Sequence, residues 1–127
     1  MPVLGGSENI LLVDDEEPIV KMEQQALERL GYRVTVHTGS VDALETFKAD
    51  SDAFDLVITD MTMPNMTGTR LAGEIKKIRP DIPVILCTGF SYQVNSEKNR
   101  ALGIEGYVMK PVITKEIAAV IRKVLAV

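Results

Sequence analysis

The amino-acid sequence predicts an α/β fold, a three-layer sandwich in which helices cover both faces of a doubly wound parallel sheet. Short runs rich in Val, Ile and Leu alternate along the chain with helical patterns. Several of these runs are apolar throughout rather than at every second position, as expected of strands that are buried on both faces. The chain has 127 residues, of which 46% are hydrophobic, so its length suits one domain with a single core.

Five segments have the composition of buried strands. They are residues 9–13, 33–37, 55–59, 83–87 and 106–109. Cys87 is the only cysteine, and we expect it to be a small buried hydrophobic residue of the fourth strand. A single cysteine excludes a disulfide bond within the chain.

The clearest helix lies between the first two strands. Pro18 suits its first turn, where the missing N–H of proline has no cost. Gly31 can end the helix, because glycine adopts the backbone conformation that commonly follows a helix. Apolar residues recur between them at helical spacing and are expected to face the core: Ile19, Met22, Ala26, Leu27 and Leu30.

Four further helices are expected, which gives five in all. The fourth, within residues 92–102, is polar and poorly patterned, so we expect it to be the most mobile element. The expected first residues or caps are Ser40 or Asp42 for the second helix, Thr67 or Thr69 for the third, which ends before Pro80, and Thr114 for the last. The expected inward residues are Val41, Leu44 and Phe47, then Leu71, Ile75 and Ile78, then Ile117, Val120, Ile121 and Val124.

Residues 1–8 differ in composition from the rest of the chain. They contain the stretch "LGGSE", and glycine and serine favour flexible segments. We therefore expect residues 1–8 to be a flexible N-terminal segment or the end of a linker, and residues 9–127 to form the domain.

The charge of the chain argues against two classes of partner. Lys and Arg number 14 against 18 Asp and Glu, a formal net charge of −4, which favours neither direct nucleic-acid binding nor contact with an anionic membrane. The apolar runs are too short to span a membrane, and the N-terminus lacks the basic and apolar regions of a secretory signal. We expect a cytoplasmic protein.

The residues that end the predicted strands carry the functional information. Asp14 and Asp15 end the first strand, Asp60 follows the third, Thr88 the fourth and Lys110 the fifth. Ligands of parallel α/β sheets bind at the carboxyl ends of the strands. These side chains are therefore expected to meet at one edge of the sheet.

Three neighbouring carboxylates repel one another unless a cation lies between them. Oxygen ligands without sulfur or imidazole favour Mg²⁺, with Mn²⁺ as the alternative. Pro64 turns the chain after Asp60, which would allow the carbonyl of Thr62 to face the metal. A carboxylate nucleophile, a metal, the ammonium of Lys110 and the hydroxyl of Thr88 are the groups that in-line phosphoryl transfer to an aspartate requires.

Four motifs carry a resemblance to a known family. They are "LLVDDE", "DLVITDMTMPNMTG", "VILCTGF" and "GYVMKP", and they occur in this order at the predicted strand ends. From residue 9 to residue 127 the chain resembles the receiver domain of two-component response regulators, the CheY-like phosphoacceptor module. The resemblance implies a flavodoxin-like fold with five helices and strand order 2-1-3-4-5.

The resemblance also implies a role for each acidic residue. Asp60 would be the phosphorylated residue. Asp15, Asp60 and the backbone carbonyl of Thr62 would bind Mg²⁺ directly, whereas Asp14 would act mainly through water.

The same resemblance assigns the remaining groups of the site. Thr88 and Lys110 would hold the phosphoryl oxygens, and Thr88 and Tyr107 would form a switch in which the tyrosine turns inward after phosphorylation. The peptide bond between Lys110 and Pro111 would be cis.

The implied function is that of a signalling switch rather than an enzyme, although such a domain assists its own phosphorylation and dephosphorylation. The donor would be the phosphohistidine of a histidine kinase or phosphotransfer domain. The face formed by the fourth helix, the fifth strand and the last helix would then control an unidentified output partner or attached domain, and the domain would be a monomer or a weak dimer through this face. The "LGGSE" segment resembles the junction before the terminal receiver of a hybrid sensor kinase.

Three other functions are open to a chain of this kind. A haloacid-dehalogenase-like phosphatase also uses an aspartyl nucleophile and Mg²⁺, but its second aspartate is replaced here by Thr62. A flavodoxin-like cofactor binder needs a phosphate loop after the first strand, where "DDEEP" would repel phosphate. An interaction module that is never phosphorylated would not need the complete set of acids, hydroxyl and lysine.

Simpler interpretations apply to several of these residues when each is considered alone. Asp14 and Asp15 would cap a helix, and Tyr107 would be a core residue. His37, the only histidine, is expected to have a structural or surface role away from the acids. Met61, Met63 and Met66 are expected to pack in a loop rather than bind a soft metal, since no Cys or His accompanies them.

Overall fold

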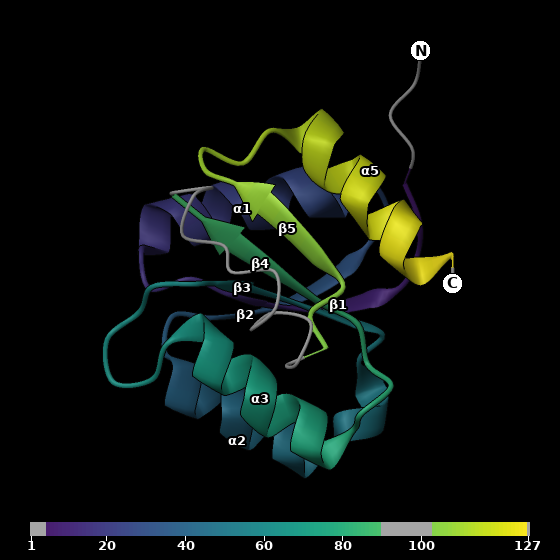
Figure 1. Cartoon of the computed structure of the whole chain (residues 1–127). Coiled ribbons are helices and arrows are strands. Elements are labelled where there is room, and N and C mark those ends of the chain that lie inside the picture. Colours follow the sequence, from purple (N-terminus) through teal and green to yellow (C-terminus); the bar gives the residue numbers. More distant parts are fainter. Residues whose placement is uncertain (1–4, 90–102, 127) are drawn as a thin grey trace.

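The sheet has five parallel strands, and their order in space is β2-β1-β3-β4-β5 (Figure 1). The computed structural model describes residues 5–89 and 103–126 of the chain. The predicted order and parallel pairing are confirmed, although β3 and β4 each begin and end one residue later than expected. The strand bounds are β1 Asn9–Val13, β2 Arg33–His37, β3 Leu56–Asp60, β4 Val84–Thr88 and β5 Gly106–Met109.

Helices cover both faces of this sheet (Figure 1). Helices α1 and α5 lie on one face, and α2 and α3 lie on the other. The predicted helix within residues 92–102 lies outside the described residues, which contain four α-helices and one 3-10 turn. The bounds are α1 Glu17–Arg29, α2 Ser40–Ala49, the 3-10 turn η1 Ser51–Ala53, α3 Gly68–Ile78 and α5 Thr114–Leu125.

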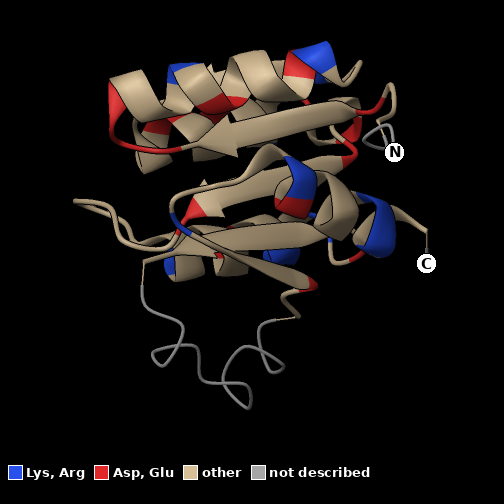
Figure 2. Cartoon of the chain, turned by 90° about the horizontal axis from the view of Figure 1, so that it is seen from above, with Lys and Arg blue, Asp and Glu red and all other residues tan. Residues whose placement is uncertain are grey.

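Two apolar cores form because successive strand residues point to opposite faces of the sheet. In β1, Leu11 and Val13 join the core under α2 and α3, whereas Ile10 and Leu12 join the core under α1 and α5. All four side chains are at most 1% exposed. This burial on both faces is the reason that β1, β3 and β4 are largely apolar, whereas the edge strand β2 is only partly buried. Charged residues lie mainly on helices and at strand ends (Figure 2).

The predicted helix ends are confirmed for α1 and α3. Pro18 lies in the first turn of α1, and Gly31 follows the helix with a φ of 102°, a left-handed conformation that favours glycine. Thr67 is the N-cap of α3, and its hydroxyl accepts a hydrogen bond from the backbone N–H of Arg70 at 3.3 Å.

Ser40 begins α2, as one of the two expected first residues, but it is not the N-cap, and the predicted cap of α5 at Thr114 is wrong. Gly39 and Ile113 occupy the N-cap positions, so Ser40 and Thr114 are the first helical residues and make no capping bond. The hydroxyl of Ser40 instead donates to the backbone carbonyl of Met66, in the loop before α3. A contact with another element has therefore replaced the local capping bond.

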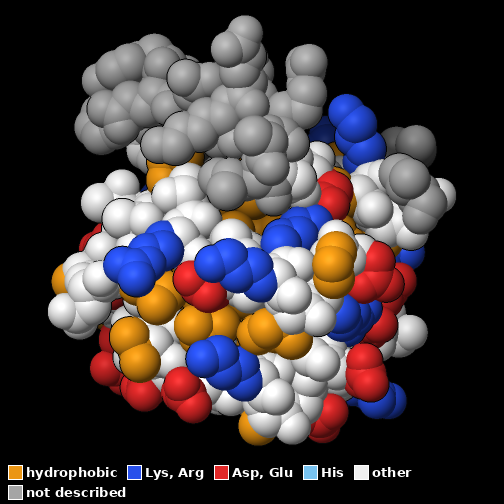
Figure 3. All heavy atoms as spheres, turned by 60° about the horizontal axis from the view of Figure 1, so that its bottom comes forward, with side chains coloured by type: hydrophobic (Ala, Val, Ile, Leu, Met, Phe, Trp, Pro, Cys, Tyr) orange, Lys and Arg blue, Asp and Glu red, His pale blue; other side chains and the backbone are white. Residues whose placement is uncertain are grey.

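Three residues that were expected to face the core are exposed. Met22 is 61% exposed, Val41 50% and Ile78 38%. In α1 the inward line consists of Val20, Glu23 and Leu27, so the actual buried face is rotated from the predicted one and includes an acid. On the side of α2 and α3, exposed hydrophobic groups are interspersed with Lys and Arg side chains (Figure 3).

The part of the N-terminal segment that the structure describes runs beside α1 and α5. The N–H of Gly6 donates to the carbonyl of Leu30 at 3.0 Å, and the carboxylate of Glu8 lies 2.7 Å from the guanidinium of Arg122. The domain boundary between residues 8 and 9 stays a prediction. Within the described ranges, no helix combines the length and the apolar composition that crossing a membrane requires.

Candidate functional site

Side chains from three strand ends meet at the carboxyl edge of the sheet. The side-chain nitrogen of Lys110, which follows β5, lies 3.0 Å from Asp14 Oδ2 and 3.3 Å from Asp60 Oδ1. Asp14 follows β1, and Asp60 is the last residue of β3. The fold thus brings together two carboxylates and an ammonium group from positions far apart in the sequence.

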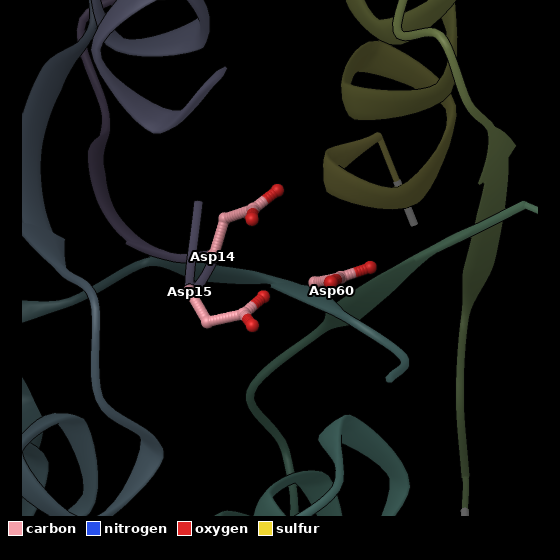
Figure 4. A group of neighbouring side chains, drawn as sticks. All are labelled: Asp14, Asp15 and Asp60. Atoms are coloured by element: carbon pink, nitrogen blue, oxygen red, sulfur yellow. The ribbon is translucent and has the colours of Figure 1, made fainter. Parts of the chain in front are cut away.

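Asp15 completes a group of three carboxylates (Figure 4). One oxygen from each of Asp14, Asp15 and Asp60 lies within 4.8 Å of the other two. Asp14 and Asp60 are 1% and 7% exposed, whereas Asp15 is an exposed residue. The acid group is therefore buried where Asp14 and Asp60 lie and open to solvent at Asp15. Its possible metal ligands are all carboxylate oxygens, which are hard donors.

Asp14 is held by the backbone as well as by Lys110. Its Oδ1 accepts a hydrogen bond from the N–H of Glu16 at 3.0 Å, and its own N–H donates to the carbonyl of His37 on β2 at 3.2 Å. Both carboxylate oxygens of Asp14 thus have partners within the protein. This pairing reduces the cost of burying its charge.

The pKa values of the site reflect its burial and its charge. Burial raises the pKa of Asp60; the ammonium of Lys110 opposes this effect, and the charges of Asp14 and Asp15 add to it. Burial by itself would lower the pKa of Lys110, but its hydrogen bonds and ion pairs with Asp14 and Asp60 outweigh burial and raise that pKa. Lys110 is therefore firmly protonated and helps to keep Asp60 ionised.

The loop between β3 and α3 begins and ends next to Asp60. The N–H of Met61 donates to the carbonyl of Cys87 at 2.8 Å, and the N–H of Gly68 donates to the carbonyl of Met61 at 2.8 Å. A Cβ atom at Gly68 would collide with the carbonyl oxygen of Asp60, so the close approach of α3 to the end of β3 requires glycine. Thr62, whose carbonyl is the predicted metal ligand, lies exposed in this loop.

Thr88 and Tyr107 lie on the neighbouring strands β4 and β5. Thr88 is 4% exposed at the end of β4, and its carbonyl accepts a hydrogen bond from the N–H of Lys110 at 2.8 Å. Tyr107 is partly buried against the core under α2 and α3. Its hydroxyl oxygen is shielded from solvent and has no hydrogen-bond partner among the described residues.

The peptide bond between Lys110 and Pro111 is cis, as the resemblance implies. The switch role of Thr88 and Tyr107 stays a prediction, as do the separate roles of the acids and of Lys110.

Glu23 is a buried acid close to the site. It was not predicted from the sequence. It lies on α1 and is 6% exposed. Burial raises its pKa to about 7, the charges of Asp14 and Asp60 add to this effect, and Lys110 opposes it. The sequence pattern that could have indicated its burial is its spacing. Glu23 lies three residues after Val20 and four before Leu27, which places all three on one side of the helix.

The remaining residues with a predicted structural role lie as follows. The ring nitrogen Nε2 of His37 lies 2.9 Å from the hydroxyl of Thr46 on α2. Met63 is 6% exposed in the core, which fits the predicted packing of the loop methionines. Cys87 is 2% exposed, and its burial raises the pKa of the thiol.

The family model of the response regulator receiver domain matches residues 10–122. The chain is 32% identical over 122 residues to the sensor kinase CckA of Brucella abortus and 37% identical over 116 residues to the transcriptional regulator NtrC of Azospirillum brasilense. These matches cover 96% and 91% of this chain but only 13% and 24% of those proteins.

Solved structures show the same fold. A receiver domain protein from Clostridium thermocellum is 33% identical, with a TM-score of 0.87 and 94% of each chain covered. The response regulator TrrA from Thermotoga maritima, solved with Mg²⁺ and BeF, is 33% identical, with a TM-score of 0.82, and the match covers 93% of this chain and 99% of that one.

Proposed function

The chain belongs to the response regulator receiver domain family, and from this premise we propose that it is a phosphoacceptor switch with Asp60 as the acceptor. The observation that carries the proposal is the position of Lys110, whose ammonium contacts both Asp14 and Asp60 while Asp15 completes the acid group. An ion pair that only stabilised the fold would not need a third, exposed carboxylate beside it.

The acid group fits a hard divalent cation. Its three carboxylates present oxygens within 4.8 Å of one another, and no thiol or imidazole belongs to the group. We propose that Asp15, Asp60 and the carbonyl of Thr62 hold Mg²⁺ directly, with Asp14 acting through water and Mn²⁺ as a substitute. When bound, the cation would offset the negative charge of the phosphoryl oxygens.

The residues of the chain supply the rest of the reaction. A carboxylate oxygen of Asp60 forms a bond to the phosphorus atom while the bond from phosphorus to the donor imidazole breaks, and the electron pair of that bond stays on the imidazole nitrogen. The ammonium of Lys110, 3.3 Å from Asp60, is placed to attract the transferred oxygens. The hydroxyl of Thr88 would hydrogen-bond to one of these oxygens.

Asp60 meets the two requirements of such an acceptor. At 7% exposed it is shielded from bulk water, yet Lys110 favours the ionised form that acts as the nucleophile. We class the chain as a signalling domain that assists its own phosphorylation and dephosphorylation rather than as an enzyme, because the receiver domain family is a signalling family.

The partners follow from the family. We propose a histidine kinase or a phosphotransfer domain as the donor, and an output partner or attached domain that contacts a face including β5 and α5; the predicted fourth helix of this face lies outside the described residues. The chain matches a segment that makes up 13% of a sensor kinase. A receiver-like segment within a larger kinase supports our proposal that this chain has its place in a hybrid kinase. We expect a monomer, or a weak dimer through the same face.

The test is chemical labelling of the isolated chain. A small-molecule phosphodonor with Mg²⁺ should add one phosphoryl group, seen by intact mass, to the wild type and to Asp55→Asn but not to Asp60→Asn. Asp55 is a matched control because it is an exposed aspartate directly before β3, at the end of the strand opposite Asp60. Labelling of Asp60→Asn at the wild-type level would refute the assignment.

A further inference from the structure

Ser40 makes a hydrogen bond that its helix does not require. It is the first residue of α2 and is 3% exposed, and its hydroxyl donates to the carbonyl of Met66 at 2.8 Å. Serine at the start of a helix commonly caps the backbone, but here Gly39 occupies the N-cap position. The hydroxyl is committed instead to the loop between β3 and α3.

The loop that receives this bond is otherwise tied to the protein mainly at its ends. Met61 is fixed by bonds to Cys87 and Gly68, and Thr67 begins α3. Among the hydrogen bonds of the described residues, positions 62–66 have one from the N–H of Met66 to the carbonyl of Pro64, inside the loop, and one from Ser40, on another element. Ser40 is therefore the polar anchor of this part of the loop.

The anchored part of the loop is the part that carries the proposed metal ligand. Thr62 precedes Met66 by four residues, and between them Asn65 has a φ of 70°, a left-handed conformation that few residues other than glycine adopt. Met63 is buried in the core under α2 and α3, so its side chain and the Ser40 bond both restrain the loop. Loss of either restraint would allow the backbone at Thr62 to move.

We propose that Ser40 is a positioning residue for metal binding: by holding the carbonyl of Met66, it keeps the carbonyl of Thr62 directed toward Asp15 and Asp60. The inference rests on the proposed function, because it assumes that the acid group binds Mg²⁺. Ser40 touches neither the metal nor the phosphoryl group, and it acts through the loop. A partner that orients a ligand in this way contributes to affinity although it is not itself a ligand.

The test measures Mg²⁺ binding by calorimetry, with the metal alone and no phosphodonor. Ser40→Ala should raise the Kd for Mg²⁺ about three- to tenfold, somewhat less than the roughly 10- to 100-fold typical when a direct partner of a ligand is lost. At saturating Mg²⁺ its rate of labelling at Asp60 should return to the wild-type value, since the groups that react are unchanged.

The matched control is Thr46→Val, which removes a hydrogen bond of similar length from the same helix. The hydroxyl of Thr46 lies 2.9 Å from His37 Nε2, and no hydrogen bond among the described residues joins it to the loop. Thr46→Val should lower the melting temperature as Ser40→Ala does, yet leave the Kd for Mg²⁺ unchanged. Ser40→Cys, whose thiol is a weaker donor of similar size, should give an intermediate Kd and decides the question if Ser40→Ala does not fold.

The outcomes separate this inference from the proposed function. A wild-type chain that binds no Mg²⁺ would overturn both. Mg²⁺ binding by the wild type with an unchanged Kd in the folded Ser40 variants would overturn only the role of Ser40. An equal rise of the Kd in Thr46→Val would also overturn it, because the effect would then follow from general loss of stability.

Discussion

The ammonium nitrogen of Lys110 lies 3.0 Å from a carboxylate oxygen of Asp14, an aspartate that is 1% exposed. The other oxygen of Asp14 accepts a hydrogen bond from the N–H of Glu16, so both are engaged within the protein. Asp15, the next residue, is exposed. The two neighbouring aspartates therefore differ in burial and in how far their oxygens are already engaged within the protein, although they are adjacent in the sequence.

The first prediction follows from this difference. Asp15→Ala should weaken Mg²⁺ binding more than Asp14→Ala, because the first loses a proposed direct ligand and the second a contact through water. We expect about a tenfold rise in the Kd for Asp14→Ala and a larger one for Asp15→Ala. Calorimetric titration of both variants measures this, and equal or reversed losses would contradict the assigned roles.

The second prediction concerns the ionisation of Asp60. Burial raises the pKa of Asp60 and Lys110 opposes that effect, so Lys110→Gln should raise the pKa further. The pH at which labelling of Asp60 reaches half of its maximum should therefore move upward, whatever happens to the maximal rate. Lys115→Gln, an exposed lysine of α5, serves as the control. An unchanged midpoint in Lys110→Gln would show that the lysine does not control this carboxylate.

The third prediction concerns Glu23 and the pH dependence of stability. Its pKa rises from 4.5 to about 7 on folding, so the folded state favours the protonated acid. The contribution to stability is fully present below about pH 4.5 and is lost as the pH rises through about 7. After allowance for solvent screening, the loss by about pH 8 is on the order of 1 to 2 kcal/mol.

Urea denaturation at about pH 5 and about pH 8 tests this. Glu23→Gln should lose less free energy of unfolding than the wild type between the two conditions, because an amide does not ionise. Glu28→Gln, at an exposed position of the same helix, should keep the wild-type dependence. If Glu23→Gln and the wild type change equally, Glu23 is not the titrating group.

The fourth prediction concerns the switch. Thr88→Ala should still accept a phosphoryl group at Asp60 but lose much of the resulting change at Tyr107. The missing hydroxyl would remove one hydrogen bond to a charged group, a contribution of about 1.5 to 3 kcal/mol that helps to shift the population. Tyr107 has a shielded hydroxyl without a partner among the described residues, so its present position gains no hydrogen bond there.

Amide hydrogen exchange across residues 92–102 and 104–109 measures that change, with unphosphorylated samples of both proteins as controls. The wild type should respond to phosphorylation in both segments, and Thr88→Ala should respond much less. A Thr88→Ala protein that responds as fully as the wild type would exclude this coupling.

Local chemistry accounts for the parts of the fold that the sequence predicted well. The runs through Leu11, Ile58 and Ile85 are apolar on both faces, and a parallel strand between two helical layers is the arrangement that buries both. Pro18 and Gly31 act on the backbone next to them, so the bounds of α1 followed from their own conformational limits. Such effects need no knowledge of distant residues.

The predicted helix faces failed where neighbours decide the orientation. Met22 and Val41 are apolar and were expected to be buried, yet both are at least half exposed. The side of each helix that packs on the sheet differs from the side that the apolar spacing predicted. Glu23 was not among the residues predicted to face the core, and an isolated acid ordinarily prefers water. Its burial follows from its place between Val20 and Leu27, and proximity to Asp14 and Lys110 is a property of the assembled layers.

The sequence by itself determined the order of elements and the residues that end each strand, because hydrophobic patterning and backbone limits act over a few neighbouring positions. From parallel strands alone it followed that Asp14, Asp60 and Lys110 would share an edge. Only the tertiary structure decided that Lys110 pairs with both aspartates and that Ser40 bonds to Met66 rather than capping its helix. Hydrogen bonds and ion pairs act over a few ångströms, so they depend on which distant side chains the packed layers bring within reach.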